Sequence, residues 1–460
     1  MTRMISSGPE FSRRSFLAGV GGLTFSIAFL GNSAPALNAA GKPGAANLSA
    51  WVRIGADNIV TIFNPSAEMG QGSMTALPLI IAEEMDADWS RVKIEQSPVE
   101  AKTYGNPTRF GHQMLTVGSR TVQGYYDSLR KAGAQVRKVL IAAAADHWKV
   151  PASEVKTEIG VVVHGPSDRR LTYGEIAAFA KMPAKLPDVS DGDLKNPSQF
   201  RLIGNKDIGR SDIPAKVDGT AVYGLDVQVP GMVYAVMTRA PVHGSKPVGS
   251  NASDIKKIPG VIDVVTLNHG MVVVAGTMED AIKARKSLKI NWSKGAKAEN
   301  FQSEKDLTDR YLKIHDNNAA GESLIKKGDV KSAMAGVAKT YQAEYYSDHA
   351  YHAQMEPLNA VAHVNAAGDG AEVWAGTQAL DGARKSAAQA LGVGVDKIVF
   401  HPCYLGGGFG RRSWSDYVEE AVLTSKAVKR PVKLMWSRED DIAYGAFRPM
   451  ALQCLKAGVD

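Results

Sequence analysis

Cysteine is scarce in this sequence: the 460 residues include only Cys403 and Cys454, with no C-x-x-C pair. The chain by itself therefore cannot hold an iron–sulfur cluster on four thiolates or a structural zinc finger. It also lacks an apolar run of the ~20 residues that a membrane-spanning helix needs, which argues against a polytopic membrane protein. Runs of basic residues are missing too, and 54 Lys and Arg against 47 Asp and Glu give a net charge of +7. This mild excess supports weak attraction to an anionic surface and no nucleic-acid groove.

What the sequence does have is an ordinary globular composition, with 44% hydrophobic and 22% charged residues. That composition supplies ample core and excludes disorder for most of the chain. The length allows two to four domains at roughly 100–200 residues each.

The N-terminus has the pattern of an export signal. Arg13 and Arg14 directly precede a moderately apolar run, Phe16 to Leu30, and small residues follow it. This pattern predicts a twin-arginine signal over residues 1–45, which exports proteins already folded, and hence a periplasmic location. Two alternatives stay open: a chance Arg-Arg before a buried helix, and an uncleaved segment that anchors the chain in the inner membrane.

Periodicity and turn signals predict an α+β fold. A long helix is expected from Ser119 to Trp148, a Pro- and Asp-rich linker over 181–200 and a polar connector over 293–329. Shorter helices are expected at 77–85, 173–180, 254–257, 279–287, 380–391 and 415–429, and strands within 49–63, 89–96, 223–237, 261–274, 341–345, 360–364 and 398–400. The expected domains are 1–45 (signal), 46–200, 205–300 (an α+β unit) and 301–460. Met450 to Val459 resembles an unfinished strand, so we expect the chain to be the front part of a larger protein.

The strongest motif is a glycine loop between an expected strand and an expected helix, Leu405-Gly-Gly-Gly-Phe-Gly-Arg-Arg412. Its glycines let backbone N–H groups approach a ligand, and its two arginines are forked donors suited to phosphate. An anionic cofactor is the expected ligand, with a tight solvated turn as the alternative. The loop is neither a Rossmann fingerprint, because Arg411 stands at the third glycine position, nor a P-loop.

Three further segments are candidates. In Glu68-Met-Gly-Gln-Gly72, Gln71 offers an amide on a loop between a strand and a helix, with a structural turn equally open. On a helix, His349, His352 and Glu356 would share one face and suggest a metal site, but Pro357 and flanking strands favour a packed histidine beside a buried glutamate. The segment from Thr116 to Arg120 could bind an anion or simply cap the long helix through Ser119.

These motifs together resemble the xanthine dehydrogenase/aldehyde oxidase family, and within it the molybdopterin-binding subunit of the isoquinoline 1-oxidoreductase beta type. The resemblance runs from about Leu48 to Asp460. The motifs that match in order are Glu68-Met-Gly-Gln-Gly72, Ala82-Glu-Glu-Met-Asp86-Ala-Asp-Trp89, Gln354-Met-Glu-Pro357 and Gly406-Gly-Gly-Phe-Gly-Arg-Arg412. The unit at 205–300 resembles the family's hammerhead domain, placed between portions of the molybdopterin-binding domains.

The resemblance implies hydroxylation of N-heterocycles or oxidation of aldehydes with water as the oxygen source. It implies a molybdopterin, of the cytosine dinucleotide form, that carries molybdenum without protein ligands, and a small partner subunit with [2Fe–2S] clusters. A c-type cytochrome subunit is a further partner compatible with the periplasm. The implied cofactor-binding residues are Gly70, Gln71, Gly72, Gly407, Gly408, Phe409, Gly410, Arg411 and Arg412, with the two arginines holding either the loop or phosphates; His352 and Glu356 are the candidate substrate-pocket residues.

One departure concerns catalysis. The family's general base is a glutamate in a Gly-Glu segment that this sequence does not match, and Glu419 and Glu439 stand in a different context. No catalytic residue is therefore assigned, and we expect the chain to be inactive without a partner that carries the rest. The competing hypotheses are an inactive truncated remnant and a non-catalytic periplasmic anion-binding protein.

Overall fold

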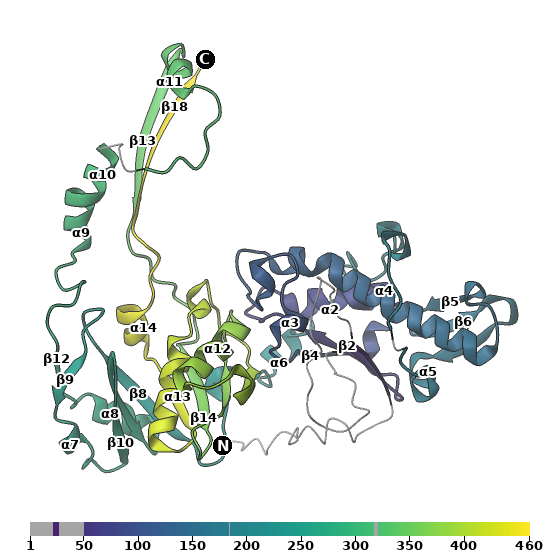
Figure 1. The fold of residues 1–460 in the computed structure, drawn as a ribbon, viewed down its shortest axis with the longest axis horizontal. Helices are drawn as coiled ribbons and strands as arrows, with labels where there is room; N and C mark the ends of the chain where they lie inside the picture. The colour runs from purple at the N-terminus through teal and green to yellow at the C-terminus, as the bar shows by residue number, and fades with distance from the viewer. Residues whose placement is uncertain (1–21, 27–49, 184, 317–320) are drawn as a thin grey trace. The chain divides into compact units, whose positions relative to one another are not determined.

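The computed structural model describes residues 22–26, 50–183, 185–316 and 321–460, which form two compact units (Figure 1). The first unit combines residues up to 232 with 359–433, and the second combines 233–358 with 434–460. Each unit thus joins stretches that are far apart in the sequence. The domain limits expected above follow chain order and stay predictions.

The mixed α+β fold that the sequence predicts is confirmed. In the first unit the helices are α2 (Ser73–Glu84), α3 (Ala101–Tyr104), α4 (Thr121–Trp148), α5 (Tyr173–Phe179), α6 (Ile213–Val217), α12 (Leu380–Leu391) and α13 (Asp416–Val428). Its strands are β1 (Gly22–Ser26), β2 (Ala50–Gly55), β3 (Val60–Asn64), β4 (Val92–Gln96), β5 (Val155–Glu158), β6 (Val161–His164), β7 (Arg169–Thr172), β14 (Asn359–Val364), β15 (Ala371–Ala375), β16 (Ile398–Pro402) and β17 (Val432–Met435).

The second unit begins with β8 (Val233–Arg239) and ends with a strand that runs to the penultimate residue. Its other strands are β9 (Pro247–Ser250), β10 (Val261–Leu267), β11 (Gly270–Ala275), β12 (Ile290–Trp292), β13 (Lys339–Ser347) and β18 (Ala451–Val459). Its helices are α7 (Ala252–Ile255), α8 (Met278–Arg285), α9 (Ser303–Asp306), α10 (Leu312–Asp316), α11 (Val330–Ala335) and α14 (Arg438–Tyr444), with a π-helical turn at Leu307–Tyr311.

Two sheets of the first unit carry the loops of interest. In the first, β3 pairs with β4 in parallel, and α2 forms the crossover between them. In the second, β15 pairs with β16 in parallel through α12, and β14 is antiparallel to β15. Loops that follow parallel strands lie at one edge of a sheet, the usual place for ligands. The segments after β3 and after β16 are the two glycine-containing motifs.

Helix α2 packs closely against α4 through a glycine. A Cβ built on Gly133 of α4 would lie 2.4 Å from the carbonyl oxygen of Ile81 and 2.7 Å from Cβ of Glu84. The fully buried Leu77, Ile81 and Leu129 belong to these two helices. The apolar period of the sequence predicted this long helix, which begins at Thr121 rather than at Ser119; Arg120 is the N-cap residue, so the expected Ser119 cap is wrong.

Two buried glutamates at the end of α2 hold the stretch that the sequence suggested as a linker. Glu83 accepts hydrogen bonds from the amides of Arg201, Leu202 and Ile203 at 2.9, 2.5 and 3.0 Å, and from Nζ of Lys195 at 2.9 Å. Burial raises the pKa of Glu83, but the bonds from Lys195 and from the backbone outweigh it and lower that pKa. Residues 193–203 are therefore fastened to the helix pair.

Glu84 completes this anchor from the next position. Its side chain accepts from Arg130 Nε at 2.8 Å and from the amide of Lys195 at 3.1 Å, and its carbonyl accepts from Arg137 at 2.6 Å. Both arginines belong to α4. The Glu-Glu pair thus ties α2, α4 and the linker together.

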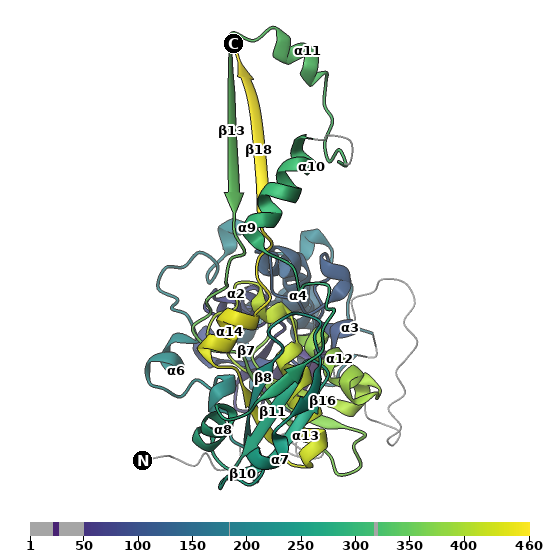
Figure 2. The same cartoon turned by 90° about the vertical axis from the view of Figure 1, so that its left-hand side faces the viewer.

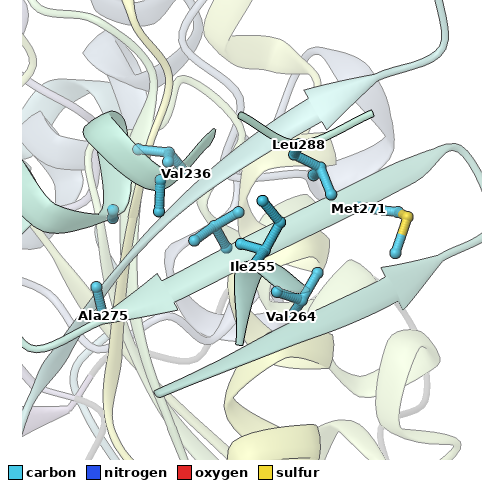
Figure 3. Packing of buried hydrophobic residues seen from close by; sticks show 9 residues of the cluster. Val236, Ile255, Val264, Met271, Ala275 and Leu288 are labelled. Carbon is cyan, nitrogen blue, oxygen red and sulfur yellow. The ribbon is translucent and has the colours of Figure 1, made fainter. Parts of the chain in front are cut away.

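The second unit contains three neighbouring antiparallel strands of a seven-stranded sheet, in the order β10-β11-β8. Figure 3 shows its core, in which the buried Val236, Val264 and Met271 pack with Ile255 of α7 and with Leu288. Figure 2 shows α8 and α7 beside this sheet. Residues 233–292 therefore form an α+β segment of the second unit.

The N-terminal signal lies mostly outside the described residues, including Arg13 and Arg14. Within that segment only residues 22–26 are described, as strand β1, antiparallel to β2. Among the described residues, no helix has the length and apolar character required to cross a membrane.

The anchor around Glu83 gives a first prediction. Lys195→Met removes the cation that pairs with Glu83 and Asp86 at 2.9 and 2.5 Å, so we expect the free energy of unfolding to fall by about 3 kcal/mol. Lys185→Met, in an exposed pair with Asp188, should cost less than about 1 kcal/mol. Urea unfolding of both variants measures this, and equal losses would contradict the anchoring role.

Candidate functional site

The first candidate loop, Glu68 to Gly72, is built around the buried carboxylate of Glu68. Its oxygens accept hydrogen bonds from the amides of Gly70 at 2.8 Å, Gly72 at 3.2 Å and Met74 at 3.0 Å. Gly70 and Gly72 have φ of 108° and 91°, values that glycine adopts without strain. Glu68 therefore takes up the donors at the start of α2 that would otherwise be open to an anion.

The amide of Gln71 is used within the same loop. Its Nε2 donates to the carbonyl of Ala67 and to the hydroxyl of Ser73, both at 2.8 Å, and its Oε1 accepts from the amide of Met69 at 2.8 Å. The side chain is nevertheless exposed. Gln71 shapes the loop while it lies at its surface.

Arg210 braces this loop from a distant segment. It donates to the carbonyl of Gly70 at 2.6 Å and to Glu68 at 3.2 Å, and it pairs with the buried Asp212. Burial raises the pKa of Asp212, but hydrogen bonds from Arg210 and Lys216 outweigh it and bring that pKa to about 2. The positive charges of Arg210 and Lys216 thus offset the negative charges of Glu68 and Asp212 next to the first loop.

The second candidate loop has a backbone conformation that residues other than glycine rarely adopt. Gly407 and Gly410 have φ of 93° and 100°, and Phe409 between them has φ of 53° with its side chain 70% exposed. Gly408 is fixed for a different reason, because a Cβ there would lie 2.5 Å from Oε1 of Gln378. That same oxygen accepts from the amide of Gly410 at 2.9 Å.

Both arginines of this loop point into the fold. Arg411 forms a bidentate pair with Asp416 at 3.0 and 2.7 Å, and Arg412 donates to the carbonyl of Gly376 at 3.0 Å. Arg411 is 1% exposed and Arg412 is fully buried. Of the two roles left open by the sequence, this geometry favours holding the loop over contacting a phosphate.

The two loops meet through Thr116 and Gln378. The hydroxyl of Thr116 lies 2.8 Å from the hydroxyl of Ser66 and accepts from the amide of Ala67 at 3.2 Å. Gln378 donates to the carbonyl of Thr116 at 2.9 Å and accepts from the amide of Gly410. The amide of Leu405 also donates to the carbonyl of Glu68 at 3.1 Å. The structure therefore brings together three segments that the sequence flagged separately.

A cavity of about 360 Å³ opens between the entries of the two loops. It is lined by Glu68 of the first loop, Met74 of α2, Trp374 of β15, and Cys403 and Tyr404, which directly precede the second loop. Tyr404 is half-buried; burial, and then the negative charges of Asp212 and Glu68, raise its pKa. The phenol is therefore a neutral donor at physiological pH.

Three consecutive amides of the second loop remain available to a ligand. Within the described residues, the N–H groups of Gly407, Gly408 and Phe409 donate no hydrogen bond to the chain, whereas Gly410 and Arg411 do. Successive backbone donors around residues with positive φ form an anion- or oxygen-binding concavity. The loop is thus held rigidly from inside and presents donors outward.

The candidate substrate residues belong to the second unit. Residues 348–358 form a loop rather than a helix, so His349, His352 and Glu356 do not share a helical face. His349 is exposed and contacts the carbonyl of Arg448 over a long 3.3 Å, whereas Glu356 is buried. No group of three His, Cys, Asp or Glu side chains among the described residues is placed to hold a metal ion.

Sequence reasoning missed the roles of four residues that shape the site. Glu68 and Thr116 stand in motifs that were noted, but nothing in the pattern marks them as internal acceptors. Gln378 and Arg210 carry no motif at all; the one signal in the sequence is a glutamine just before an expected helix, and its burial is seen only in the structure. Their roles depend on contacts across more than a hundred residues.

Comparisons with known proteins agree with this geometry. Two models of the molybdopterin cofactor-binding domain match, one over residues 13–225 and the other over residues 313–460. The first range contains the Glu68–Gly72 loop and the second contains the glycine loop. The two loops that meet through Thr116 and Gln378 thus come from two matched regions.

Three curated proteins illustrate the similarity. The beta subunit of isoquinoline 1-oxidoreductase from Brevundimonas diminuta is 39% identical over 99% of this chain and 63% of its own length. Membrane-bound aldehyde dehydrogenase (pyrroloquinoline-quinone) from Gluconacetobacter polyoxogenes is 34% identical over 91% of this chain and 54% of its own. A nicotinate dehydrogenase subunit from Pseudomonas putida is 29% identical over 86% and 32%, respectively. The chain spans less than two thirds of the length of each relative.

The contact between Gly408 and Gln378 gives a second prediction. Gly408→Ala should lower the free energy of unfolding by about 1–3 kcal/mol, because its Cβ overlaps Oε1 of Gln378. Gln378→Ala should cost about 1–3 kcal/mol by leaving the Gly410 amide without its acceptor. The double variant should lose less than the sum, since the alanine at 378 makes room. Gly209→Ala, where a Cβ meets nothing within 4 Å, is the control; additive losses would contradict the contact.

The low pKa of Asp212 gives a third prediction. A carboxyl that titrates at about 2 when folded and near its ordinary value when unfolded stabilises the fold above about pH 4, and this contribution disappears as the pH falls towards 2. Urea unfolding of the parent should therefore weaken more steeply over this window than that of Asp212→Asn. The same substitution at the exposed Asp207 should leave the parental slope. Parallel curves for the parent and Asp212→Asn would contradict the assignment.

Proposed function

Because this chain belongs to the molybdopterin-binding subunits of the xanthine dehydrogenase family, we propose that it holds the molybdenum cofactor of an oxidoreductase that hydroxylates N-heterocycles or oxidises aldehydes. The similar proteins are named as an isoquinoline oxidoreductase subunit, an aldehyde dehydrogenase and a nicotinate dehydrogenase subunit. These names support the two substrate classes.

The observation that carries the proposal is the row of amides at Gly407, Gly408 and Phe409, which the described chain leaves without acceptors. Such donors fit the oxygen-rich face of a molybdenum cofactor better than a side-chain metal site, for which no group of ligands is present among the described residues. When bound, the cofactor supplies two-electron oxidation of a carbon centre with oxygen derived from water.

The protein residues position this chemistry. Gln378 fixes the amide row from inside, and Arg411 and Arg412 fasten the loop to α13 and β15. Glu68 sets the first loop, on which Gly70, Gln71 and Gly72 lie near the surface. In this proposal Gln71 contacts the pterin by exchanging a bond within its loop for one to the ligand. Such rigid support keeps the donors in place without reorganisation during the reaction.

No residue of this chain is proposed as the general base. Glu419 and Glu439, the glutamates closest in sequence to the glycine loop and the following strand, are exposed on α13 and α14. The proposal therefore requires that a carboxylate from elsewhere in the complete enzyme acts on the substrate.

The partner and location are part of the proposal. Two cysteines are too few to hold an iron–sulfur cluster on four thiolates, so in this proposal the chain passes electrons to [2Fe–2S] clusters on a small subunit, and a c-type cytochrome subunit is a suitable next acceptor. Arg13-Arg14 supports twin-arginine export to the periplasm, with attachment to the inner membrane through a partner or an uncleaved signal. The cytosine dinucleotide form of the cofactor is proposed on the family resemblance.

Molybdenum content gives the fourth prediction. Protein purified with its bound subunits from its own host should contain about one molybdenum atom per chain by elemental mass spectrometry. Gly408→Ala should lose most of this metal because the amide row shifts, whereas Gly209→Ala should keep it. Folding of each variant is checked by circular dichroism.

A well-folded parent without molybdenum would refute the proposal and favour the inactive remnant. Phosphate or nucleotide binding in such a protein would instead favour the anion-binding alternative. Full activity of the isolated 460-residue chain would refute the requirement for a partner.

A further inference from the structure

Strands β13 and β18 form a two-stranded ribbon with no third strand among the described residues (Figures 1 and 2). They pair antiparallel without a break over all nine residues of each, from Lys339 opposite Val459 to Ser347 opposite Ala451. An isolated two-stranded ribbon is marginally stable in water. Its two outer edges also expose unpaired N–H and C=O groups.

The two faces of the ribbon differ in character. Because side chains alternate along a strand and opposite residues share a face, one face is mostly apolar and the other mostly polar. The apolar face contains Tyr341, Ala343, Tyr345, Ala451, Leu455, Ala457 and Val459, together with Lys339, Ser347 and Gln453; the polar face contains Thr340, Gln342, Glu344, Cys454, Lys456 and Gly458, with Tyr346 and Leu452 at one end. This alternation is typical of a sheet with one buried face.

The described residues nevertheless leave the apolar face exposed. Tyr341, Tyr345, Leu455 and Val459 are 51, 58, 57 and 52% exposed. Helix α11 lies on the opposite side, since a Cβ on Gly458 would meet Met334 and Val337 at 2.8–2.9 Å, and Gly458 belongs to the polar face. The described residues therefore provide no cover for the apolar side chains of this face.

The length of the relatives indicates what covers this face. The isoquinoline 1-oxidoreductase relative from Brevundimonas diminuta matches 99% of this chain over only 63% of its own length, so more than a third of that polypeptide has no counterpart here. A polypeptide of that size can supply both strands for the free edges and an apolar surface for the face. We propose that the apolar face of β13–β18 is the docking surface for the polypeptide that corresponds to this unmatched length. The proposal goes beyond the cofactor-binding function and does not depend on molybdenum.

The test uses the full 460-residue chain and, as a separate polypeptide, the part of the Brevundimonas diminuta protein that this chain does not match. The two are co-expressed and purified on a tag carried by the 460-residue chain. We expect an equimolar complex, with slowed hydrogen exchange at the amides of residues 339–347 and 451–459 relative to the chain alone.

Matched variants on the two faces distinguish a loss of docking from a loss of folding or stability. Tyr345→Ser with Leu455→Ser, on the apolar face, should weaken the complex by about tenfold or more. Gln342→Ser with Lys456→Ser, an opposed pair on the polar face, should change the dissociation constant little. Circular dichroism of each variant alone checks that the rest of the chain is folded.

Three outcomes would overturn the proposal. The first is no complex, and the second is a complex whose formation leaves ribbon exchange unchanged or that both pairs of substitutions weaken equally. The third is self-association of the 460-residue chain that the apolar-face substitutions abolish, which would assign the face to a second copy. Molybdenum content plays no part in any readout, so failure here is distinguishable from failure of the proposed function.

Discussion

The site depends on two buried side-chain acceptors that hold backbone amides. Glu68 gathers the amides of Gly70, Gly72 and Met74, and Gln378 takes the amide of Gly410 while it excludes any Cβ at Gly408. Both loops have left-handed residues, which are glycines in the first loop and include the strained Phe409 in the second. The carboxylate of Glu68 fixes the backbone of the first loop, and the amide oxygen of Gln378 fixes that of the second.

The two arginines of the second loop, Arg411 and Arg412, also hold the loop from inside. A pair of forked cations beside a glycine loop suggests phosphate binding when only the sequence is available. Burial at 1% and 0% exposure changes the interpretation, because a guanidinium that is bonded to Asp416 or to the carbonyl of Gly376 has little freedom to meet a ligand. A ligand of this loop would then be bound by backbone N–H groups, while the charges of the two arginines hold the loop in place.

Local patterns predicted much of the fold, including α12 to the residue and α4 and α13 to within two residues. They predicted the glycine loops too, since positive φ and close approach leave a direct mark on composition. They could not predict Gln378, Arg210 or the anchoring of residues 193–203, because a polar side chain acquires its role from whatever the fold brings against it. Around His352 the sequence favoured a packed histidine beside a buried glutamate over a helical metal site, and the structure has a loop there with Glu356 buried.

The separation between Thr116 and Gln378 also sets an order of events during synthesis. These residues are 262 positions apart, and the ribosome adds about 5–20 residues per second. The first loop is therefore made tens of seconds before the residue that completes it, with the whole of the second unit's early stretch emerging in between. A cofactor pocket assembled from both loops exists only after translation has passed Gln378, so cofactor loading must follow the synthesis of that part of the chain.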